Sequence, residues 1–564
     1  MRPASACQSC RLHRRKCRTS GLGERCERCT SLNLVCSNVS GPRSSSDTHI
    51  PRRGFPSLRA KEPPPHLNRI ASDPPDSLCF EHDRSDSGYV KGAVPDGGFN
   101  CNADDEDMYK KVAPTADLEL QHELVHLYFA HIHNTHHSLF HEPTVLSQVR
   151  NGSLPEVLLY AMMALGSRFS ESPSLASVER RSRGIEPAQR AFALFDMTDI
   201  SVTTVQAAVL LGTICFTESK AEAESLYYAV ANRLALMLDL AHRQTNSETE
   251  RQVNLRIWWT LYMIDVWCST GLHLPCQMRS YKTVELPANE LLFLGIAPQT
   301  PPRPTTSGIC AENAKLHQIW ADICDLNQNV MRDVQGTQSL EDQVETLLKR
   351  LEMWSAALPL HLRKTRANLE YYASIGLGPT FAALHLGYHY HTEVLCYQFL
   401  AGDASAANPE YAERCKEHAK HFCDLLYLCQ EIPNCECFFV MLGHLLVVTS
   451  TVYIHTLVFS AHEDEISIAR RRLARNFEIL MRLQSFWVKL DVSLSRLQAF
   501  HNACKISAEH SFGMDKWLLC FLLEHGVVIP EKYPPVVHVV NPPGGASPEL
   551  TLQDWYSQTF SGGQ

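Results

Sequence analysis

The stretches CQSCRLHRRKC (residues 7–17) and CERCTSLNLVC (residues 26–36) decide how the start of this 564-residue chain folds. Each stretch spaces its cysteines as C-x2-C-x6-C, and eight residues separate the two, so the six cysteines form a tandem repeat. A C-x2-C pair turns two thiolates toward one point, and structural zinc takes four such ligands. Six sulfurs complete two zinc sites if two of them bridge, and the repeat predicts a bridging pair at equivalent positions of the two halves. The predicted ligands are Cys7, Cys10, Cys17, Cys26, Cys29 and Cys36.

A disulfide framework is the alternative interpretation of the same six cysteines, which allow 15 different pairings. Residues 1–30 contain no apolar run of the kind that forms the core of a secretory signal peptide. Cysteine clusters in chains that are not secreted bind metal or perform redox chemistry, because their thiols stay reduced. The pattern therefore favours two Zn²⁺ ions over disulfides.

Basic side chains crowd into the first half of the repeat. Residues 1–40 carry eight Lys or Arg and two Asp or Glu, a formal charge of +6, whereas the whole chain carries −9, which leaves −15 for the remainder. A compact basic patch is the electrostatic footprint of a surface that binds nucleic-acid phosphates. The basic side chains of this run are Arg11, Arg14, Arg15, Lys16 and Arg18.

Residues 7–36 closely resemble the module of the fungal zinc binuclear cluster transcription factors over its full length. The resemblance implies two Zn²⁺ ions, with Cys7 and Cys26 as the bridging ligands. It also implies a short helix that enters the major groove of double-stranded DNA and reads CGG-like triplets. Arg14 stands where the family usually has a base-reading Lys, and Arg contacts guanine O6 and N7 in a bidentate manner. Arg11, Arg15, Lys16 and Arg18 are expected to contact phosphates. The resemblance implies a nuclear regulator of RNA polymerase II genes.

The composition divides the rest of the chain into three parts. Residues 41–117 are rich in Pro, Ser and Gly and are expected to form a disordered linker. They contain no sustained heptads, so DNA binding as a monomer and as a homodimer both stay open. Residues 531–564 are expected to form a flexible tail, and the acidic and apolar residues of 549–560 suit an activation segment that folds on a coactivator.

Residues 118–530 are predicted to form one large all-α domain, because their apolar residues recur at helical spacing and strand-like alternation is scarce. Two segments show this spacing well. The first contains Leu226, Val230, Leu234, Met237, Leu238 and Ala241, and the second contains Leu340, Val344, Leu347, Leu348, Leu351 and Trp354.

The segment from Arg256 to Asp265 resembles the Arg-x-Trp-Trp-x-Leu-x-x-x-Asp core of the same family's regulatory domain, the middle homology region. Val266 stands where that family usually has Arg. The paired tryptophans, Trp258 and Trp259, are expected to pack in the core rather than to bind a ligand. The resemblance implies a domain that controls activity through an effector, a coactivator or a corepressor.

Two other functions were weighed against DNA binding. His122, Glu123 and His126 satisfy the H-E-x-x-H pattern of zinc hydrolases, but the third ligand motif of such enzymes does not follow. A zinc-stabilised adaptor, with the basic run serving only nuclear import, is the second alternative. The chain shows no phosphate-binding loop, nucleophile elbow or dinucleotide fingerprint, so no enzyme is predicted.

Two further segments can be mistaken for sites. Cys415, His418, His421 and Cys423 mix thiols and imidazoles, but on a helix the first three would form one stripe and not a tetrahedron. Residues 438–459 contain no charge and are long enough to span a bilayer. Their histidines would be costly in lipid, so a buried core helix is expected and no membrane partner is predicted.

Overall fold

The computed structural model describes residues 118–272, 274–279, 283–295, 307–331, 339–400 and 408–533, together with Thr30. The six cysteines of the repeat, the basic run at residues 11–18 and the linker at 41–117 lie outside the described residues apart from Thr30, as does most of the tail at 531–564. Zinc ligation, DNA contacts and these domain boundaries therefore stay predictions.

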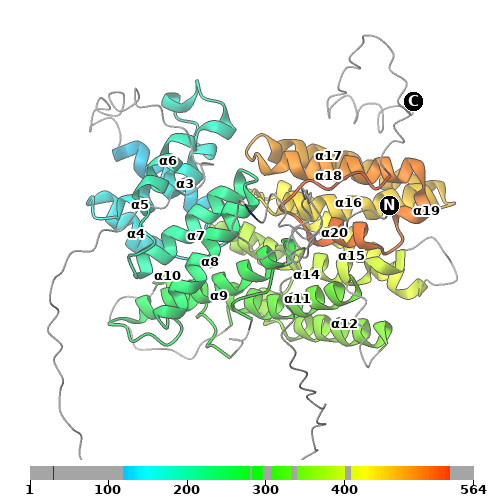
Figure 1. Cartoon of the computed structure of the whole chain (residues 1–564), viewed down its shortest axis with the longest axis horizontal. Helices are drawn as coiled ribbons and strands as arrows, with labels where there is room; N and C mark the ends of the chain where they lie inside the picture. The colour runs from blue at the N-terminus through cyan, green and yellow to red at the C-terminus, as the bar shows by residue number, and fades with distance from the viewer. Residues whose placement is uncertain are drawn as a thin grey trace, which may run out of the picture. The chain divides into compact units, whose positions relative to one another are not determined.

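Helices make up the described domain (Figure 1). Within the described residues, the one β feature is an isolated bridge between His133 and His137. The all-α prediction for this region is confirmed. The earlier helices are α3 (Leu118–His131), α4 (Glu142–Arg150), α5 (Glu156–Gly166), α6 (Ile185–Leu194), α7 (Val202–Thr217), α8 (Ala221–Met237), α9 (Glu248–Gly271) and α10 (Glu290–Gly295). The later helices are α11 (Ile309–Met331), α12 (Leu340–Ala357), α13 (Arg366–Ser374), α14 (Gly378–Cys396), α15 (Pro409–Glu431), α16 (Leu442–Phe459), α17 (Glu463–Gln484), α18 (Lys489–Ile506), α19 (Ala508–Ser511) and α20 (Lys516–Leu523).

Side-chain caps fix where several helices begin. The Ser201 hydroxyl accepts a hydrogen bond from the backbone N–H of Thr204 at the start of α7. Ser247 caps α9 in the same way, and Asp515 caps α20. Each cap satisfies a backbone donor that the helix itself leaves unpaired, which contributes about 1 kcal/mol.

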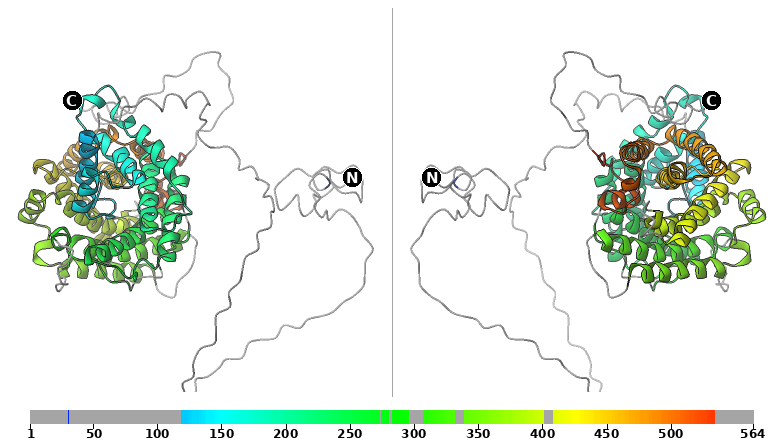
Figure 2. Two further views of the ribbon diagram at one scale, coloured as in Figure 1. Left: turned by 90° about the vertical axis from the view of Figure 1, so that its left-hand side faces the viewer. Right: turned by 90° about the vertical axis from the view of Figure 1, so that its right-hand side faces the viewer.

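The helices pack in a continuous series from one half of the domain to the other. In Figure 1 the cyan helices α3–α7 lie on one side and the orange helices α17 and α18 on the other. Helix α9 packs on α8 and α11, α11 packs on α14, and α14 packs on α16. The side views in Figure 2 show α17 and α18 next to each other in the C-terminal half. One hydrophobic core runs through both halves.

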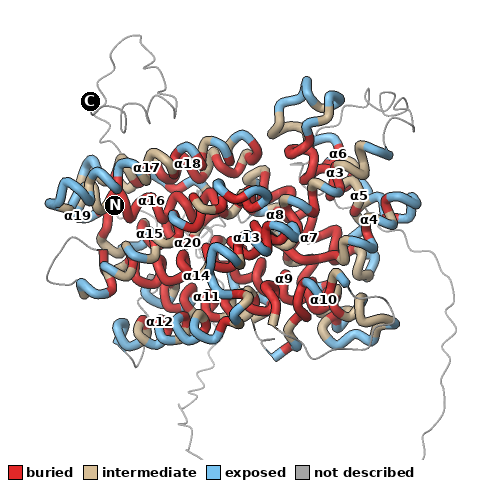
Figure 3. The backbone as a smooth tube through the Cα atoms, turned by 180° about the vertical axis from the view of Figure 1, so that it is seen from behind, coloured by how far each residue is buried: buried red, intermediate tan, exposed pale blue. Residues whose placement is uncertain are grey.

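Helix α16 lies in the centre of the C-terminal half, and its residues from Leu442 to Ile454 are all buried (Figure 3). By length and composition it is the one helix of the described residues that could cross a membrane, but 72% of it is buried inside the domain. Its neighbours α17 and α18 cover it. The core-helix interpretation of residues 438–459 agrees with this burial.

The structure corrects two details of the sequence prediction. The opening helix ends at His131, so Leu139 and His141 lie in a loop rather than on that helix. Leu226 and Met237 are 68% and 55% exposed, because α8 buries a different face that includes Tyr228. Apolar spacing alone located the helix but not its inner face.

Candidate functional site

Helix α9 carries the Arg256–Asp265 motif, and almost the whole motif is buried. Trp258 and Trp259 are 2% and 0% exposed, which confirms that they pack in the core. The Trp259 indole N–H also donates a hydrogen bond to the Glu285 carbonyl at 2.8 Å. The paired tryptophans therefore hold the segment after α9 against the helix.

The Arg256 guanidinium is buried and holds the following segment through three kinds of contact. It lies 3.5 Å from the Glu290 carboxylate, donates to the Ala288 carbonyl at 2.7 Å and stacks over the Phe293 ring at 4.2 Å. Glu290 in turn accepts the backbone N–H groups of Ile309 and residue 310, at 2.8 Å each, at the start of α11. One ion pair thus links α9, α10 and α11.

Asp265 closes the motif with the opposite charge. Its carboxylate accepts hydrogen bonds from the Met278 backbone N–H at 2.8 Å and from the side chains of Asn232 and Ser269 at 3.2 Å each. Burial raises the pKa of Asp265, and these donors oppose that shift. The charged residues of the motif therefore have structural partners, and they position the helices around the cavity described next.

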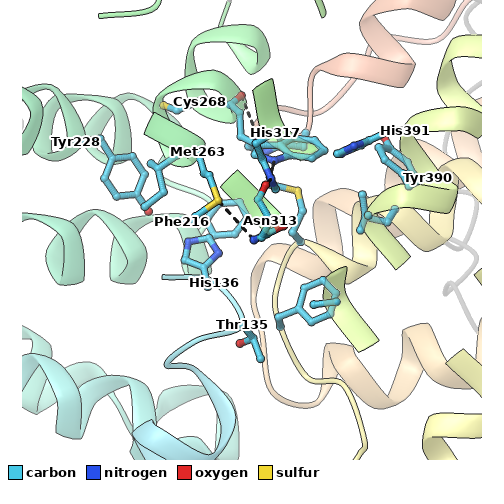
Figure 4. A pocket seen from close by; sticks show the side chains of 18 of the residues that line it. Thr135, His136, Phe216, Tyr228, Met263, Cys268, Asn313, His317, Tyr390 and His391 are labelled. Atoms are coloured by element: carbon cyan, nitrogen blue, oxygen red, sulfur yellow. Dashed lines mark hydrogen bonds between the residues drawn. The ribbon is translucent and has the colours of Figure 1, made fainter. Parts of the chain in front are cut away.

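A cavity of about 100 Å³ lies where the two halves of the domain meet (Figure 4). Its wall comes from the loop after α3, from α7, α8, α9, α11, α14 and α16, and from the segment after α20. Figure 4 shows His136 and Phe216 on one side and His317, Tyr390 and His391 on the other. Residues almost 400 positions apart in the sequence, Thr135 and His525, share this wall.

Aromatic and imidazole rings form much of the wall. The rings of His391 and Trp320 stack with centroids 4.5 Å apart and planes 13° from parallel. The rings of His136 and Phe216 stack at 5.4 Å and 10°. Trp267 lies against Trp320 at 4.8 Å. Such walls suit a flat partner, since aromatic faces favour stacked contacts.

The titratable groups on this wall are largely uncharged at neutral pH. Burial lowers the pKa of His136 and of His317 to about 4 and that of His525 to about 3. Burial also lowers the pKa of His391 well below its ordinary value. Burial raises the pKa of the Glu224 carboxyl, an effect that Lys489 partly offsets.

The loop between α3 and α4 presents His136 to the cavity because its neighbours are tightly hydrogen-bonded. The Tyr128 hydroxyl and the His137 Nε2 atom are 2.7 Å apart. The His133 Nε2 atom accepts the backbone N–H groups of Leu139 at 3.0 Å and Phe140 at 3.1 Å. The local richness in histidine thus has a structural cause as well as a place on the cavity wall.

The thiol and imidazole group on α15 separates in the structure. The Cys415 thiol donates to the Glu393 carbonyl and the Cys423 thiol to the Asn476 side chain, both at 3.5 Å. His418 instead meets His389 of α14, with their Nδ1 atoms 3.2 Å apart. The expectation that the four residues do not surround one metal agrees with this geometry.

The H-E-x-x-H residues also have separate partners. Glu123 accepts a hydrogen bond from the Ser170 hydroxyl at 2.6 Å, and the Nε2 atom of His122 accepts one from Arg150 at 3.4 Å. His126 is exposed. Among the residues with described positions, no group of three or more His, Cys, Asp or Glu side chains is arranged to hold a metal ion.

Sequence reasoning located the motif on α9 but missed the cavity. Its imidazoles come from a loop, from α11, from α14 and from the segment after α20, and no spacing rule joins such distant positions. The one available signal was the resemblance of residues up to Gly271, because a Cβ atom at Gly271 would lie 3.1 Å from the His525 ring.

Residues 125–356 match the family model described as the fungal specific transcription factor domain. An uncharacterised transcriptional regulatory protein of Schizosaccharomyces pombe is 27% identical over 50% of this chain and 32% of its own length. A second such protein of that yeast is 22% identical over 68% of this chain and 60% of its own length. A Zn(2)-C6 fungal-type transcription factor of Fusarium oxysporum f. sp. lycopersici is 23% identical over 48% of this chain and 33% of its length.

The chain spans between about a third and three-fifths of the length of these relatives. No solved structure matches it. The cavity wall extends beyond the matched range, since Ala383, His391 and His525 follow residue 356. The chain contains a fungal specific transcription factor domain and is a homologue of proteins named as fungal transcriptional regulators and Zn(2)-C6 transcription factors.

Proposed function

We propose that this chain is a nuclear, zinc-dependent regulator of RNA polymerase II genes that binds specific sequences of double-stranded DNA. One observation carries the proposal: the tandem six-cysteine repeat precedes a fungal specific transcription factor domain in the same chain. The name Zn(2)-C6 on the Fusarium relatives supports it. No enzymatic activity is part of the proposal.

Two Zn²⁺ ions would fold the N-terminal module. Six thiolates, with Cys7 and Cys26 bridging, would complete both tetrahedral sites. Modules of this size have almost no hydrophobic core, so the free energy of metal binding supplies the free energy of folding. DNA binding should therefore be lost when zinc is removed.

The basic run would divide its work between phosphates and bases. Arg14 would read a guanine in CGG-like triplets through its two parallel N–H donors. Arg11, Arg15, Lys16 and Arg18 would contact phosphates, which sets register and affinity but not sequence preference. Binding should weaken steeply with salt for the same reason.

The acidic helical domain would control the output, through coactivators, corepressors or an effector. The protein would bind DNA as a monomer or as a homodimer. Selection of sites from random DNA with the full-length protein tests this part, because the recovered triplets and their spacing distinguish one half-site from two. Recovery of no preferred sequence would favour the adaptor alternative.

Zinc content is the sharpest test of the metal site. The full-length protein should retain two zinc ions, and Cys17→Ala should lose stable binding of at least one. Cys504→Ala, which changes a cysteine of α18, is the matched control and should keep both ions. Full zinc loading of the Cys17→Ala protein would contradict the two-zinc arrangement.

Base reading by Arg14 has its own test. Arg14→Ala should cost about 1–3 kcal/mol on the best selected site and relax the preference at one base position. Lys16→Ala should weaken binding to all sequences alike and lower the salt dependence. Equal weakening on every sequence by Arg14→Ala would assign Arg14 to the phosphates instead.

A further inference from the structure

A chain of hydrogen bonds fixes the protonation pattern on one side of the cavity. His317 donates through Nδ1 to the Asn313 carbonyl at 2.9 Å, because a carbonyl only accepts. Its Nε2 atom accepts the Trp267 indole N–H at 3.0 Å. His525 then donates through Nε2 to the Trp267 carbonyl at 3.3 Å. In a neutral imidazole the other nitrogen must accept, so His525 Nδ1 is an acceptor.

Three imidazole nitrogens on this wall have no partner among the described residues. They are Nδ1 of His525, Nδ1 of His391 and Nε2 of His136. His391 and His525 are only 1% and 3% exposed. A buried polar atom without a partner costs about 1–3 kcal/mol, and most such atoms in proteins are satisfied. Three of them around one cavity indicate that something else supplies the missing hydrogen bonds.

The charge of the wall restricts what that partner is. The imidazoles are neutral because burial lowers their pKa values, and the Tyr228 and Cys268 side chains keep their protons because burial raises theirs. A charged guest would lose its hydration without gaining a counter-ion, which is costly. The partner is therefore uncharged.

The size and shape of the cavity restrict the partner further. A cavity of about 150 Å³ lined by apolar side chains holds benzene. At about 100 Å³ this one has room for a single small ring or a group of similar size. The stacked pairs His391–Trp320 and His136–Phe216 favour a flat guest.

We propose that this cavity is a binding site for a small, uncharged, planar molecule with an N–H donor and an adjacent acceptor, of the azole or carboxamide class. The donor pairs with His525 Nδ1, and His391 and His136 pair with the remaining polar atoms. The guest contacts helices of both halves of the domain, so its binding stabilises their packing. Its use as an effector rests on the proposed regulatory function, but binding itself does not.

Small probes test the site on the full-length, zinc-loaded protein. Pyrazole has the required donor and acceptor, thiophene has the same shape without a donor, and acetate carries a charge. With a Kd near 1 mM, pyrazole at about 10 mM should raise the Tm by about 1–2 °C. Isothermal titration calorimetry should show one site per chain. Thiophene and acetate should give neither response.

Two variants tie the response to the cavity. Gly387 lies on the wall, and a Cβ atom there would meet only Leu316, at an ordinary 3.7 Å. Gly387→Leu should fill the cavity and abolish the pyrazole response. His391→Phe should keep the stacking on Trp320, remove the unpaired nitrogen and weaken pyrazole binding at least tenfold. His385→Phe changes a buried histidine of the same helix that bonds Leu362 outside the cavity, and should leave binding unchanged.

The outcomes separate the proposal from simple hydration. If the unpaired nitrogens bind only water, pyrazole will not bind, and the proposal fails. Equal responses to pyrazole and thiophene would overturn the hydrogen-bonding role of His525. Unchanged pyrazole affinity in the His391→Phe protein would overturn the assignment of the site, even if Gly387→Leu does not fold. None of these results involves DNA, so the proposed function is tested independently.

Discussion

Two groups of histidines in the helical domain contrast in how they satisfy their nitrogens. At the cavity, His391 and His525 are almost completely buried and each leaves one nitrogen unpaired. Between α14 and α15, His389 bonds Lys364 at 2.7 Å through Nε2 and His418 at 3.2 Å through Nδ1. That second group lines an open pocket of about 630 Å³, where water reaches it.

The contrast shows that local density of histidine says little about its role. In the open group the Lys364 ammonium donates to His389, which leaves the Nδ1–H of His389 to donate to His418. In the cavity the corresponding donors are missing. An imidazole without a partner in a sealed place points to a ligand, whereas an imidazole in a solvated chain points to structure or solvent.

Acid should break the contrast with the largest effect. A histidine whose pKa falls on folding takes up a proton in the unfolded chain first, below the ordinary 6.5. Its stabilising effect is therefore complete above that pH and is lost as the pH falls toward the folded value. Burial lowers the pKa of five almost fully buried histidines, to about 3 for two of them. They are His133, His137, His391, His444 and His525.

Each of these five costs about 1.4 kcal/mol at one pH unit below 6.5, which together approaches the whole stability of an ordinary domain. Urea unfolding followed by far-UV circular dichroism should thus give a much lower midpoint at pH 5.5 than at pH 7.5. Equal midpoints at the two pH values would mean that these imidazoles are not neutral in the folded protein.

Gly271→Ala should sharpen the contrast at His525, with an intermediate effect. The new Cβ would lie 3.1 Å from the His525 Nε2 atom, which is held by the Trp267 carbonyl. We expect destabilisation of about 1 kcal/mol, although alanine favours helices over glycine by a similar amount. Thermal unfolding checks this. Gly387→Ala is the control and should stabilise, since its Cβ has room.

His418→Phe should give the smallest effect. It removes the partner of His389 Nδ1, but the pocket is open and water replaces the lost hydrogen bond. We expect a change in unfolding free energy below about 1 kcal/mol. A loss of several kcal/mol in urea unfolding would show that this group is as sealed as the cavity.

The sequence predicted the fold class of the described domain because helical spacing is a local property. It also located the buried motif on α9, since Trp258, Trp259 and Asp265 lie within one helix. It could not predict the cavity, because Thr135, His317, His391 and His525 meet only through tertiary packing. Nor could it predict which face of α8 is buried, where Leu226 is exposed and Tyr228 is not.

The burial of α16 has a consequence for synthesis of the chain. This apolar helix leaves the ribosome before α17 and α18, the two helices that later cover much of it. Until residue 506 has been made, a segment that meets the length and composition of a membrane anchor stays uncovered. Chains that stop near Phe459 should aggregate or be captured by chaperones. A premature stop codon there would therefore remove the protein, even though the whole family-matched region has been translated.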